Sequence, residues 1–318
     1  MAGTINSVKA LINGQEYTLT LNSSTGKYEA QGIAPSGSSF NLEGGYYPIE
    51  VTATYVTGTT SVVNDKTEGV VGEGCRMCVR EKVKPTAIIN YPTQGQYITT
   101  ELQKIEFTVL DNTSQESGFS GINIDSIVVN ITGGSLNEPV VIRGSKSLEV
   151  TPIEGGYECI LVPSEPIPDG VYTVSLDVSD NDGNAAVTAV VTATIDTAPP
   201  ELSVISPAEG LNTSNNVITV AGNTSDVTSA PVKVSVNING EDKGTIPVND
   251  DGSFSKDFML TFSGNQVIVI TTTDSAGKAS SVTRNIYFSA DVPTIKSVII
   301  TPNPVDGGTT FTITVEVE

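Results

Sequence analysis

An internal repeat constrains the fold of this chain more than any other feature of its sequence. Three stretches, residues 45–58, 170–183 and 264–277, each begin and end with glycine and have Tyr or Asp three positions before the second glycine. The residues between these anchors are rich in Val, Ile, Thr and Tyr, which favour β-strands. Each stretch therefore predicts a long strand that leads into a hairpin turn. The Tyr and Asp anchors are Tyr55, Asp180 and Asp274.

The spacing of the repeat predicts a series of small domains. Asp180 and Asp274 lie 94 positions apart, which matches one small β-sandwich per copy. Because proline stiffens short connectors, the proline-marked joints between copies predict an elongated array. These joints are Lys84-Pro85-Thr86, Ala198-Pro199-Pro200 and Asp291-Val292-Pro293. The predicted domains are residues 1–84 (domain one), 85–197 (domain two) and 198–291 (domain three), followed by a C-terminal segment of two strands, 292–318.

Domain three shows the clearest series of strands. Its β-prone runs alternate with turns rich in Gly, Asn, Asp and Pro, as in an aligned sandwich of two sheets. The runs cover residues 201–205, 216–221, 232–238, 244–248, 253–260, 265–274 and 279–288.

The composition narrows the function mainly by exclusion. Acidic residues outnumber basic residues by 36 to 16, which gives a net charge of −20. Because this charge repels nucleic acids and anionic membranes, we expect neither as a partner. The chain has no histidine, which excludes His-based triads and acid–base schemes. We therefore predict no catalytic residues, no enzymatic activity and no cofactor.

The cysteines do not predict a metal or redox site. Cys75 and Cys78 form a C-x-x-C pair, but the residues over 75–83 alternate as in a strand, where positions three apart point to opposite faces. A zinc site would need further Cys or His ligands, and Cys159 lies in another repeat. We interpret the pair as structural thiols.

One acidic turn leaves an alternative open. Asp180-Asn-Asp-Gly-Asn184 resembles the start of a calcium loop, but Val191 stands where an EF-hand needs its bidentate acid. Such residues are also common in hairpin turns. We predict no metal site, with a looser interdomain calcium site formed by Asp180, Asp182 and Asp111 as the alternative.

Several short strings resemble known repeat proteins. Three of them look like the tandem bacterial immunoglobulin-like repeats of surface adhesins and phage virion proteins: Asp196-Thr-Ala-Pro-Pro-Glu-Leu-Ser-Val-Ile-Ser-Pro207, Asp250-Asp-Gly-Ser-Phe254 and Thr273-Asp-Ser-Ala-Gly277. Three others are similar to immunoglobulin-like proteins encoded among the tail genes of phages of Gram-positive bacteria: Gly44-Gly45-Tyr46-Tyr47, Val79-Arg-Glu-Lys-Val-Lys-Pro85 and Val298-Ile-Ile-Thr-Pro-Asn-Pro-Val305. The resemblance implies an all-β fold of tandem immunoglobulin-like β-sandwiches.

The resemblance also implies a function. We expect a non-enzymatic structural or adhesive component of a phage or phage-tail-like particle, assembled in the host cytoplasm, whose partners are other virion proteins or copies of itself. The N-terminus shows no basic region followed by an apolar core, and no long apolar run occurs, which favours this reading. The alternative is an extracellular bacterial surface adhesin whose loops bind glycan or another component of the host surface.

The two ends of the chain are complementary in sequence. When Asn13-Gly14 is aligned with Asn239-Gly240, domain one starts at the third strand of a repeat, and the C-terminal segment resembles the two strands that precede it. Because an alternating apolar strand needs a partner sheet, we predict that this segment is donated to another copy in a homo-oligomer. Two alternatives stay open: domain one is complete in a smaller form, and the tail pairs locally or with a different protein. The predicted interface residues are Val298, Ile300, Phe311, Ile313, Val315 and Val317.

Overall fold

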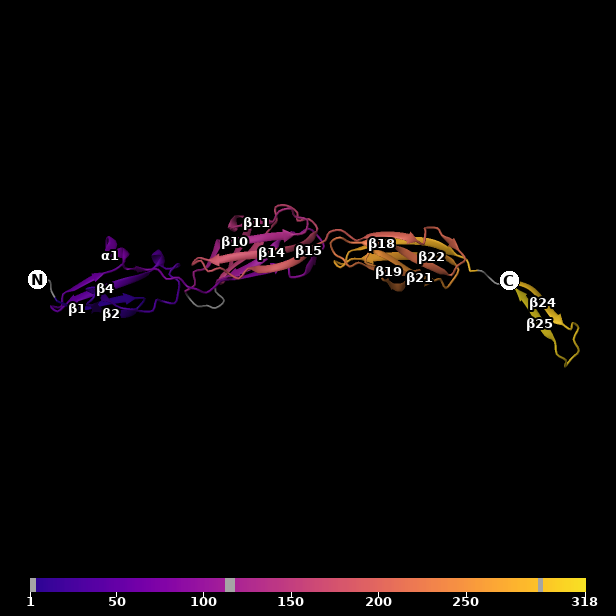
Figure 1. Ribbon diagram of the computed structural model, residues 1–318, viewed down its shortest axis with the longest axis horizontal. Coiled ribbons are helices and arrows are strands. Elements are labelled where there is room, and N and C mark those ends of the chain that lie inside the picture. The colour runs from indigo at the N-terminus through magenta and orange to yellow at the C-terminus, as the bar shows by residue number, and fades with distance from the viewer. Residues whose placement is uncertain (1–3, 112–117, 291–293) are drawn as a thin grey trace. The chain divides into compact units, whose positions relative to one another are not determined.

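A computed structural model describes residues 4–111, 118–290 and 294–318 (Figure 1). The chain divides into two compact units, Met1–Ile195 and Asp196–Glu318, and each is described by itself. Strands dominate both units. The described helical elements are α1 (Val70–Glu73), η1 (Glu43–Gly45) and η2 (Ser145–Ser147). Among the described residues, no helix has the length and apolar character needed to cross a membrane.

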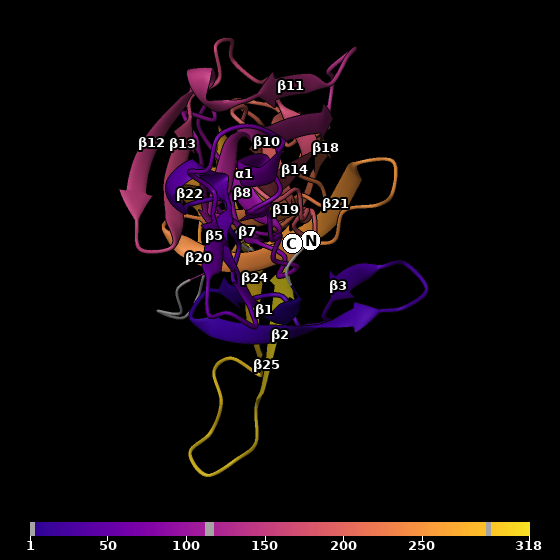
Figure 2. The same cartoon turned by 90° about the vertical axis from the view of Figure 1, so that its left-hand side faces the viewer.

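Domain one is built on one antiparallel sheet. The strand order is β3-β2-β1-β4-β5, with β6 beside β4, and β3 lies at one edge (Figure 2). The strands are β1 (Ile5–Ile12), β2 (Gln15–Asn22), β3 (Lys27–Glu29), β4 (Tyr47–Tyr55), β5 (Thr60–Val63) and β6 (Arg76–Met77). Within residues 4–84, the described strands belong to this one sheet.

Domain two is a sandwich of two sheets. One sheet has the order β12-β13-β9-β7 and the other β11-β10-β14-β15-β8. Because side chains alternate along a strand, every second residue of β9 enters the core, where Ile105, Phe107 and Val109 are at most 1% exposed. The strands are β7 (Thr86–Tyr91), β8 (Gln96–Ile98), β9 (Ile105–Leu110), β10 (Ile122–Gly133), β11 (Val140–Arg143), β12 (Leu148–Ile153), β13 (Gly156–Leu161), β14 (Gly170–Asp180) and β15 (Ala189–Ile195).

Domain three has the same two-sheet plan. One sheet has the order β16-β18-β21 and the other β17-β23-β22-β19-β20. Its core is apolar and contains Phe254, Ile268 and Ile270. The strands are β16 (Glu201–Ser206), β17 (Asn212–Thr213), β18 (Val217–Ser225), β19 (Lys233–Ile238), β20 (Glu241–Ile246), β21 (Ser253–Met259), β22 (Gly264–Thr273) and β23 (Ala279–Phe288).

Domains one and three share a hairpin turn that aligns their strands. Asn13 joins β1 to β2 and Asn239 joins β19 to β20, and both have a positive φ, 46° and 57°, a conformation that asparagine tolerates better than most residues. The next strand pairs in the same register, because Ile12 lies opposite Ile49 and Ile238 lies opposite Ile268. Strands β1, β2 and β4 therefore correspond to β19, β20 and β22.

The C-terminal segment forms a separate two-stranded hairpin, β24 (Ile295–Thr301) and β25 (Thr312–Val317). Within the described part of the chain, each of these strands pairs only with the other. Isolated two-stranded hairpins are marginally stable in water.

The structure confirms the all-β fold of tandem immunoglobulin-like domains, and the strands of domain three agree with the predicted runs. It adds the short strand β17. The prediction of a strand over 75–83 is wrong, because only β6 forms there. Backbone N–H groups further along this segment donate to side chains instead of to a neighbouring strand. The N–H of Val79 donates to Ser39 Oγ, and that of Glu81 donates to Asp182 Oδ2. The joint predicted at residues 291–293 lies outside the described residues.

Candidate metal centres

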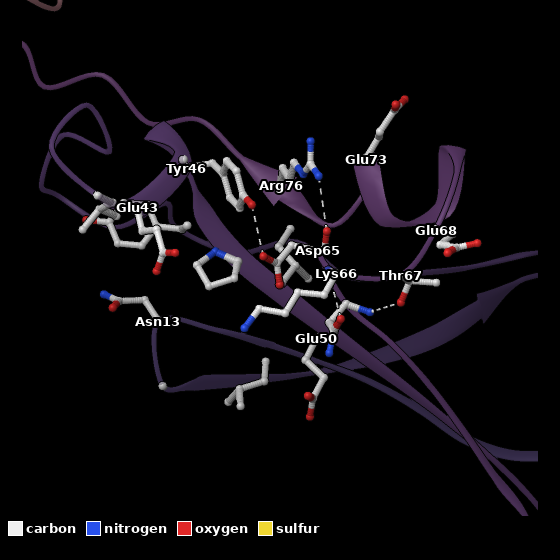
Figure 3. Close-up of a pocket in the computed structure, with 18 of the residues that line it drawn as sticks. Asn13, Glu43, Tyr46, Glu50, Asp65, Lys66, Thr67, Glu68, Glu73 and Arg76 are labelled. Carbon is white, nitrogen blue, oxygen red and sulfur yellow. Dashed lines mark hydrogen bonds between the residues drawn. The ribbon is translucent and has the colours of Figure 1, made fainter.

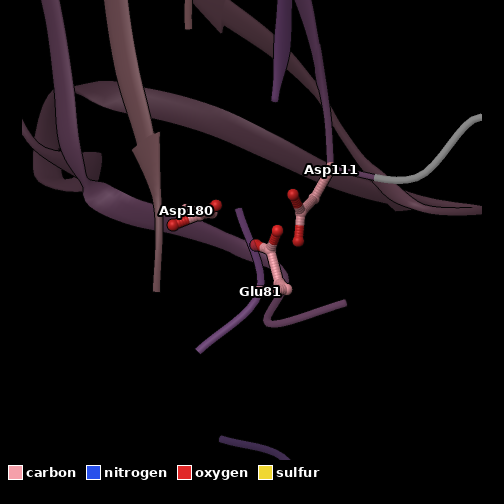
Figure 4. A group of neighbouring side chains, drawn as sticks. All are labelled: Glu81, Asp111 and Asp180. Carbon is pink, nitrogen blue, oxygen red and sulfur yellow. The ribbon is translucent and has the colours of Figure 1, made fainter. Parts of the chain in front are cut away.

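Three buried carboxylates converge in the first unit (Figure 4). Glu81 lies five positions before β7, Asp111 directly follows β9, and Asp180 is the last residue of β14. One oxygen from each of the three groups lies within 4.8 Å of the other two. The three residues are only 6%, 4% and 1% exposed.

Local hydrogen bonds hold these carboxylates in place. The side-chain amide of Asn184 donates to Asp180 Oδ2 over 2.7 Å and to Glu81 Oε1 over 3.1 Å. The N–H of Gly121 donates to Asp111 Oδ2. The turn after β14 therefore orients two of the acids, and the loop before β10 orients the third.

Among the residues that the structure describes, the first cluster has no basic side chain paired with it. Asp111 Oδ1 is buried without a hydrogen-bond partner in the described structure, and none of the described salt bridges involves the three acids. Buried polar atoms are nearly always paired, and buried charges are normally compensated by an opposite charge or a metal. An unpaired carboxylate oxygen on a member of this acidic cluster is therefore compatible with a site that binds a cation.

Burial and nearby negative charges raise the pKa values of Glu81 and Asp111. Burial raises the pKa of Glu81 to about 7, and the hydrogen bond to Asp180 and the charges of Asp180 and Asp111 add to the effect. Burial also raises the pKa of Asp111, reinforced by Asp180 and Asp182 and opposed by the Gly121 N–H. A divalent cation would reverse these shifts, because it favours the ionised carboxylates.

The pKa of Glu81 predicts how the metal-free protein responds to pH. In the unfolded chain this group ionises near 4.5, whereas in the folded chain it ionises at about 7. Between these values only the unfolded state loses the proton, so the contribution of Glu81 to the free energy of unfolding falls as the pH rises from about 4.5 to 7 and is constant above that. Urea denaturation at several pH values, with EDTA present, measures this slope. Glu81→Gln should remove the contribution of Glu81 to this pH dependence. The same slope in Glu81→Gln as in the wild type would contradict the assignment of the slope to Glu81.

A second cluster of the same kind lies in the second unit. Asp196 lies five positions before β16, Asp226 directly follows β18, and Asp274 directly follows β22. Their carboxylate oxygens also lie within 4.8 Å of one another. Asp196 and Asp274 are buried, and Asp274 Oδ2 lacks a hydrogen-bond partner in the described structure.

The second cluster is also held by the backbone of its own turns. Asp226 Oδ1 accepts hydrogen bonds from the N–H groups of Thr228 and Ser229, over 2.8 and 2.6 Å. Asp274 Oδ1 accepts one from the N–H of Lys278 over 2.8 Å. The hydroxyl of Ser229 also contacts Asp196 Oδ2.

The two clusters occupy equivalent places in domains two and three. Each takes one acid from the segment before the first strand, one from the end of β9 or β18, and one from the end of β14 or β22. Asp180 and Asp274 are anchors of the internal repeat, and the third anchor, Tyr55 in domain one, offers no carboxylate. The arrangement thus recurs with the domain and is not an accident of one loop.

The donor set selects the kind of metal. All side-chain donors in both clusters are carboxylate oxygens, which suit hard cations such as Ca²⁺. Zinc prefers nitrogen and sulfur ligands. The residues therefore fit a Ca²⁺ ion that has several carboxylate ligands and completes its coordination with backbone oxygens or water.

The structure separates the three residues of the alternative calcium site that the sequence suggested. Asp180 and Asp111 belong to the first cluster, whereas Asp182 binds the backbone N–H of Glu81 through Oδ2. Sequence reasoning missed Glu81 and the whole second cluster. The available signal was the shared spacing: an acid five positions before a strand in both domains, and an acid at the end of the repeated strand.

The predicted interface residues lie together on the C-terminal hairpin. Val298 pairs with Val315, and Ile300 pairs with Ile313, so these side chains share one face. All six predicted residues are exposed, by 41–58%. The interface itself stays a prediction.

The cysteines are free. Cys75 and Cys159 are buried, and Cys78 is exposed. Burial raises the pKa of the Cys159 thiol to about 11, which makes it a poor nucleophile.

A hollow of about 1030 Å³ in domain one has a polar lining (Figure 3). The Tyr46 hydroxyl donates to Asp65 Oδ2 over 3.1 Å, and the Arg76 guanidinium lies 5.1 Å from the centre of the Tyr46 ring. Arg76 also donates to the backbone oxygen of Asp65. These contacts hold the segment after β5 against β4 and leave carboxylates such as Glu50 around an open hollow.

Comparison with known proteins gives partial matches. The model of the family described as glucodextranase, domain B, matches residues 200–290. Bacillopeptidase F of Bacillus subtilis (strain 168) is 28% identical over 207 residues, which cover 64% of this chain but only 14% of that protein. The matched stretch is thus a small part of the relative.

Solved structures with some similarity include repeat proteins. A tetra-tandem repeat from the extending region of a large adhesion protein has a TM-score of 0.35 and 16% identity, covering 98% of this chain and 79% of that one. The fibronectin(III)-like modules of Clostridium thermocellum CbhA have a TM-score of 0.33 and 13% identity, and the match covers 64% of this chain and 95% of that one. At these values nothing about function is transferred to this chain.

Proposed function

We propose that this chain is a non-enzymatic structural and adhesive protein whose immunoglobulin-like domains are stiffened by Ca²⁺. The recurrence of a three-carboxylate cluster with at least two buried members at the same place in domains two and three supports this proposal. A cation at either place would neutralise the cluster and join the segment before the first strand to two strand ends.

The first cluster would act at a joint. Glu81 belongs to the segment that leads from domain one to domain two, whereas Asp111 and Asp180 belong to domain two. The same joint contains direct contacts, since the N–H of Ser38 donates to the Gly118 oxygen, and the amide of Asn41 donates to the Ser120 oxygen. Ca²⁺ bound there would restrict the motion of domain one against domain two, which suits a protein that holds a binding end away from its base.

The setting that we propose is a phage or phage-tail-like particle. It rests on the resemblance of the sequence to tail-encoded immunoglobulin-like proteins. Mass spectrometry of purified particles from the source bacterium, beside washed cells and culture medium, tests it. Enrichment with the particles is the expected result, and recovery only with the cell surface would favour the adhesin alternative.

The polar hollow of domain one supports that adhesin alternative. Its carboxylates, the Asn13 amide and Tyr46 offer the polar and aromatic contacts that a glycan needs. If it binds sugar, glycan-array signals should fall with Asp65→Ala, which removes the contact to Tyr46. The exposed Asp250→Ala in domain three should leave them unchanged.

A further inference from the structure

We infer that the Asn13-Gly14 turn of domain one is a site of spontaneous deamidation, from which the equivalent Asn239-Gly240 turn of domain three is protected. The inference rests on the hydrogen bonds around the two turns. It depends neither on the cation sites nor on a bound partner.

The two turns are closely matched in sequence and in backbone conformation. Asn-Gly occurs twice in the chain, and each pair follows an isoleucine. Asn13 and Asn239 have φ values of 46° and 57°, and Gly14 and Gly240 have φ values of 76° and 85°. Both asparagines are exposed. A difference in reactivity between the two turns therefore has to come from the groups around them.

Asn-Gly pairs are chemically labile because glycine has no Cβ to shield its backbone nitrogen. That nitrogen attacks Cγ of the asparagine and loses its proton, a cyclic succinimide forms, and Nδ2 takes up a proton and leaves as ammonia. Water then adds to one of the two ring carbonyls and breaks its bond to the nitrogen, which gives aspartate or isoaspartate. A Cβ built on Gly14 or on Gly240 would meet no atom within 4 Å, so both turns have open space around the attacking nitrogen.

In domain three, hydrogen bonds hold both reacting groups. Nδ2 of Asn239 donates to Gln266 Oε1 over 2.7 Å, and Oδ1 of Asn239 accepts from the N–H of Val267 over 2.8 Å. These two bonds fix the side chain that carries the carbon under attack. The attacking nitrogen is held as well, because the Gly240 N–H donates to Asn237 Oδ1 over 2.8 Å. Asn239 can therefore react only after these hydrogen bonds open.

Domain one has none of these three hydrogen bonds. The strand register shared by the two domains places different residues at the three partner positions. In the same order, they are Tyr47, Pro48 and Leu11. Proline has no N–H, the leucine side chain has no polar atom, and the Tyr47 hydroxyl donates to the Gly37 oxygen instead. Among the described residues, neither the Asn13 side chain nor the Gly14 N–H has a hydrogen-bond partner.

Deamidation would change the polar hollow of domain one. Asn13 lines this hollow together with Glu43 and Glu50 (Figure 3). Either product would add a negative charge there, and isoaspartate would also lengthen the backbone of the turn by a methylene group. The hollow of an aged chain would thus differ in charge from that of a newly made chain.

Peptide mapping by mass spectrometry measures both reactions in one sample. The folded chain is incubated at mildly alkaline pH, which favours loss of the proton from the attacking nitrogen, and is digested with trypsin beside an unincubated sample. Asn13 and Asn239 fall in separate tryptic peptides, residues 10–27 and 234–243, and fragment spectra distinguish Asn13 from Asn22 in the first. Because two or more hydrogen bonds have to open at Asn239, Asn13 should deamidate at least about tenfold faster.

The unfolded chain is the control for local sequence. In guanidinium chloride the hydrogen bonds of the domain three turn are lost, and both asparagines still lie between isoleucine and glycine. They should therefore deamidate at similar rates.

Two reciprocal substitutions test the hydrogen bond to the attacking nitrogen. Asn237→Leu removes the acceptor of the Gly240 N–H and should speed the deamidation of Asn239. Leu11→Asn introduces an acceptor at the matching place in domain one and should slow the reaction there. Each variant changes one hydrogen bond, which corresponds to a factor of about 2 to 10 in rate. Leu11 is 43% exposed and Asn237 is half-buried, and circular dichroism checks that each variant remains folded.

Three results from the wild type would overturn the inference. They are equal rates at the two asparagines of the folded chain, a faster reaction at Asn239, and a difference that persists unchanged in guanidinium chloride. Unchanged rates in both reciprocal variants would also contradict it.

Discussion

Calcium added to EDTA-treated protein should raise the melting temperatures of domains two and three. A ligand that binds only the folded state at 100 times its Kd stabilises by about 2.7 kcal/mol, which corresponds to roughly 10 °C for a domain of about 100 residues. The effect should be large because Asp111 Oδ1 and Asp274 Oδ2 lack hydrogen-bond partners in the described structure, and the cation would relieve the repulsion among the three acids of each cluster. Differential scanning calorimetry with and without Ca²⁺ measures the shift.

Substitutions should separate the two sites. Asp111→Asn should abolish the calcium shift of domain two and leave that of domain three, and Asp274→Asn should do the opposite. Without calcium, Asp111→Asn should not destabilise domain two at pH 7.5, because the change removes a buried charge whose pKa is raised. The exposed residues Glu149 and Asp250 provide matched controls, as Glu149→Gln and Asp250→Asn. A calcium shift that survives in both cluster variants would show that the ion binds elsewhere.

Phe254→Ala should destabilise domain three by about 3–5 kcal/mol. Phe254 is 2% exposed and packs in the core beside Ile268 and Ile270, so truncation removes buried apolar surface and leaves a cavity. Such a loss is a large part of the total stability of a small domain. Chemical denaturation should therefore show domain three unfolding at a much lower denaturant concentration.

Phe262→Ala is the matched control for this change. Phe262 lies in the same domain but is 56% exposed, so its truncation should change the free energy of unfolding by less than about 1 kcal/mol. Similar losses in the two variants would mean that Phe254 is not a core residue.

The strands could be predicted from the sequence because their signal is local. A run of β-branched residues identifies a strand such as β22 from its own ten residues, and Asn13-Gly14 and Asn239-Gly240 identify the turns that align domains one and three. The strand expected over 75–83 failed because tertiary contacts with Ser39 and Asp182 took the backbone donors that a sheet would have used.

The clusters could not be predicted in full because their members are far apart in sequence. Glu81 and Asp180 meet only after the sandwich has formed, and no local pattern shows that an aspartate at the end of a strand is buried. Aspartate is common in turns because its side chain bonds to the nearby backbone, so Asp180 in a turn does not by itself indicate a metal ligand. Sequence reasoning named Asp180 and Asp111 as candidate ligands, and the fold was needed to find Glu81 and the second cluster.

The number of bound calcium ions tests the central proposal most directly. Native mass spectrometry or isothermal titration calorimetry should find two Ca²⁺ ions per wild-type chain, one in Asp111→Asn, one in Asp274→Asn and none in the double variant. A wild type that binds no calcium at millimolar concentration, or the same number of ions in all four proteins, would contradict it.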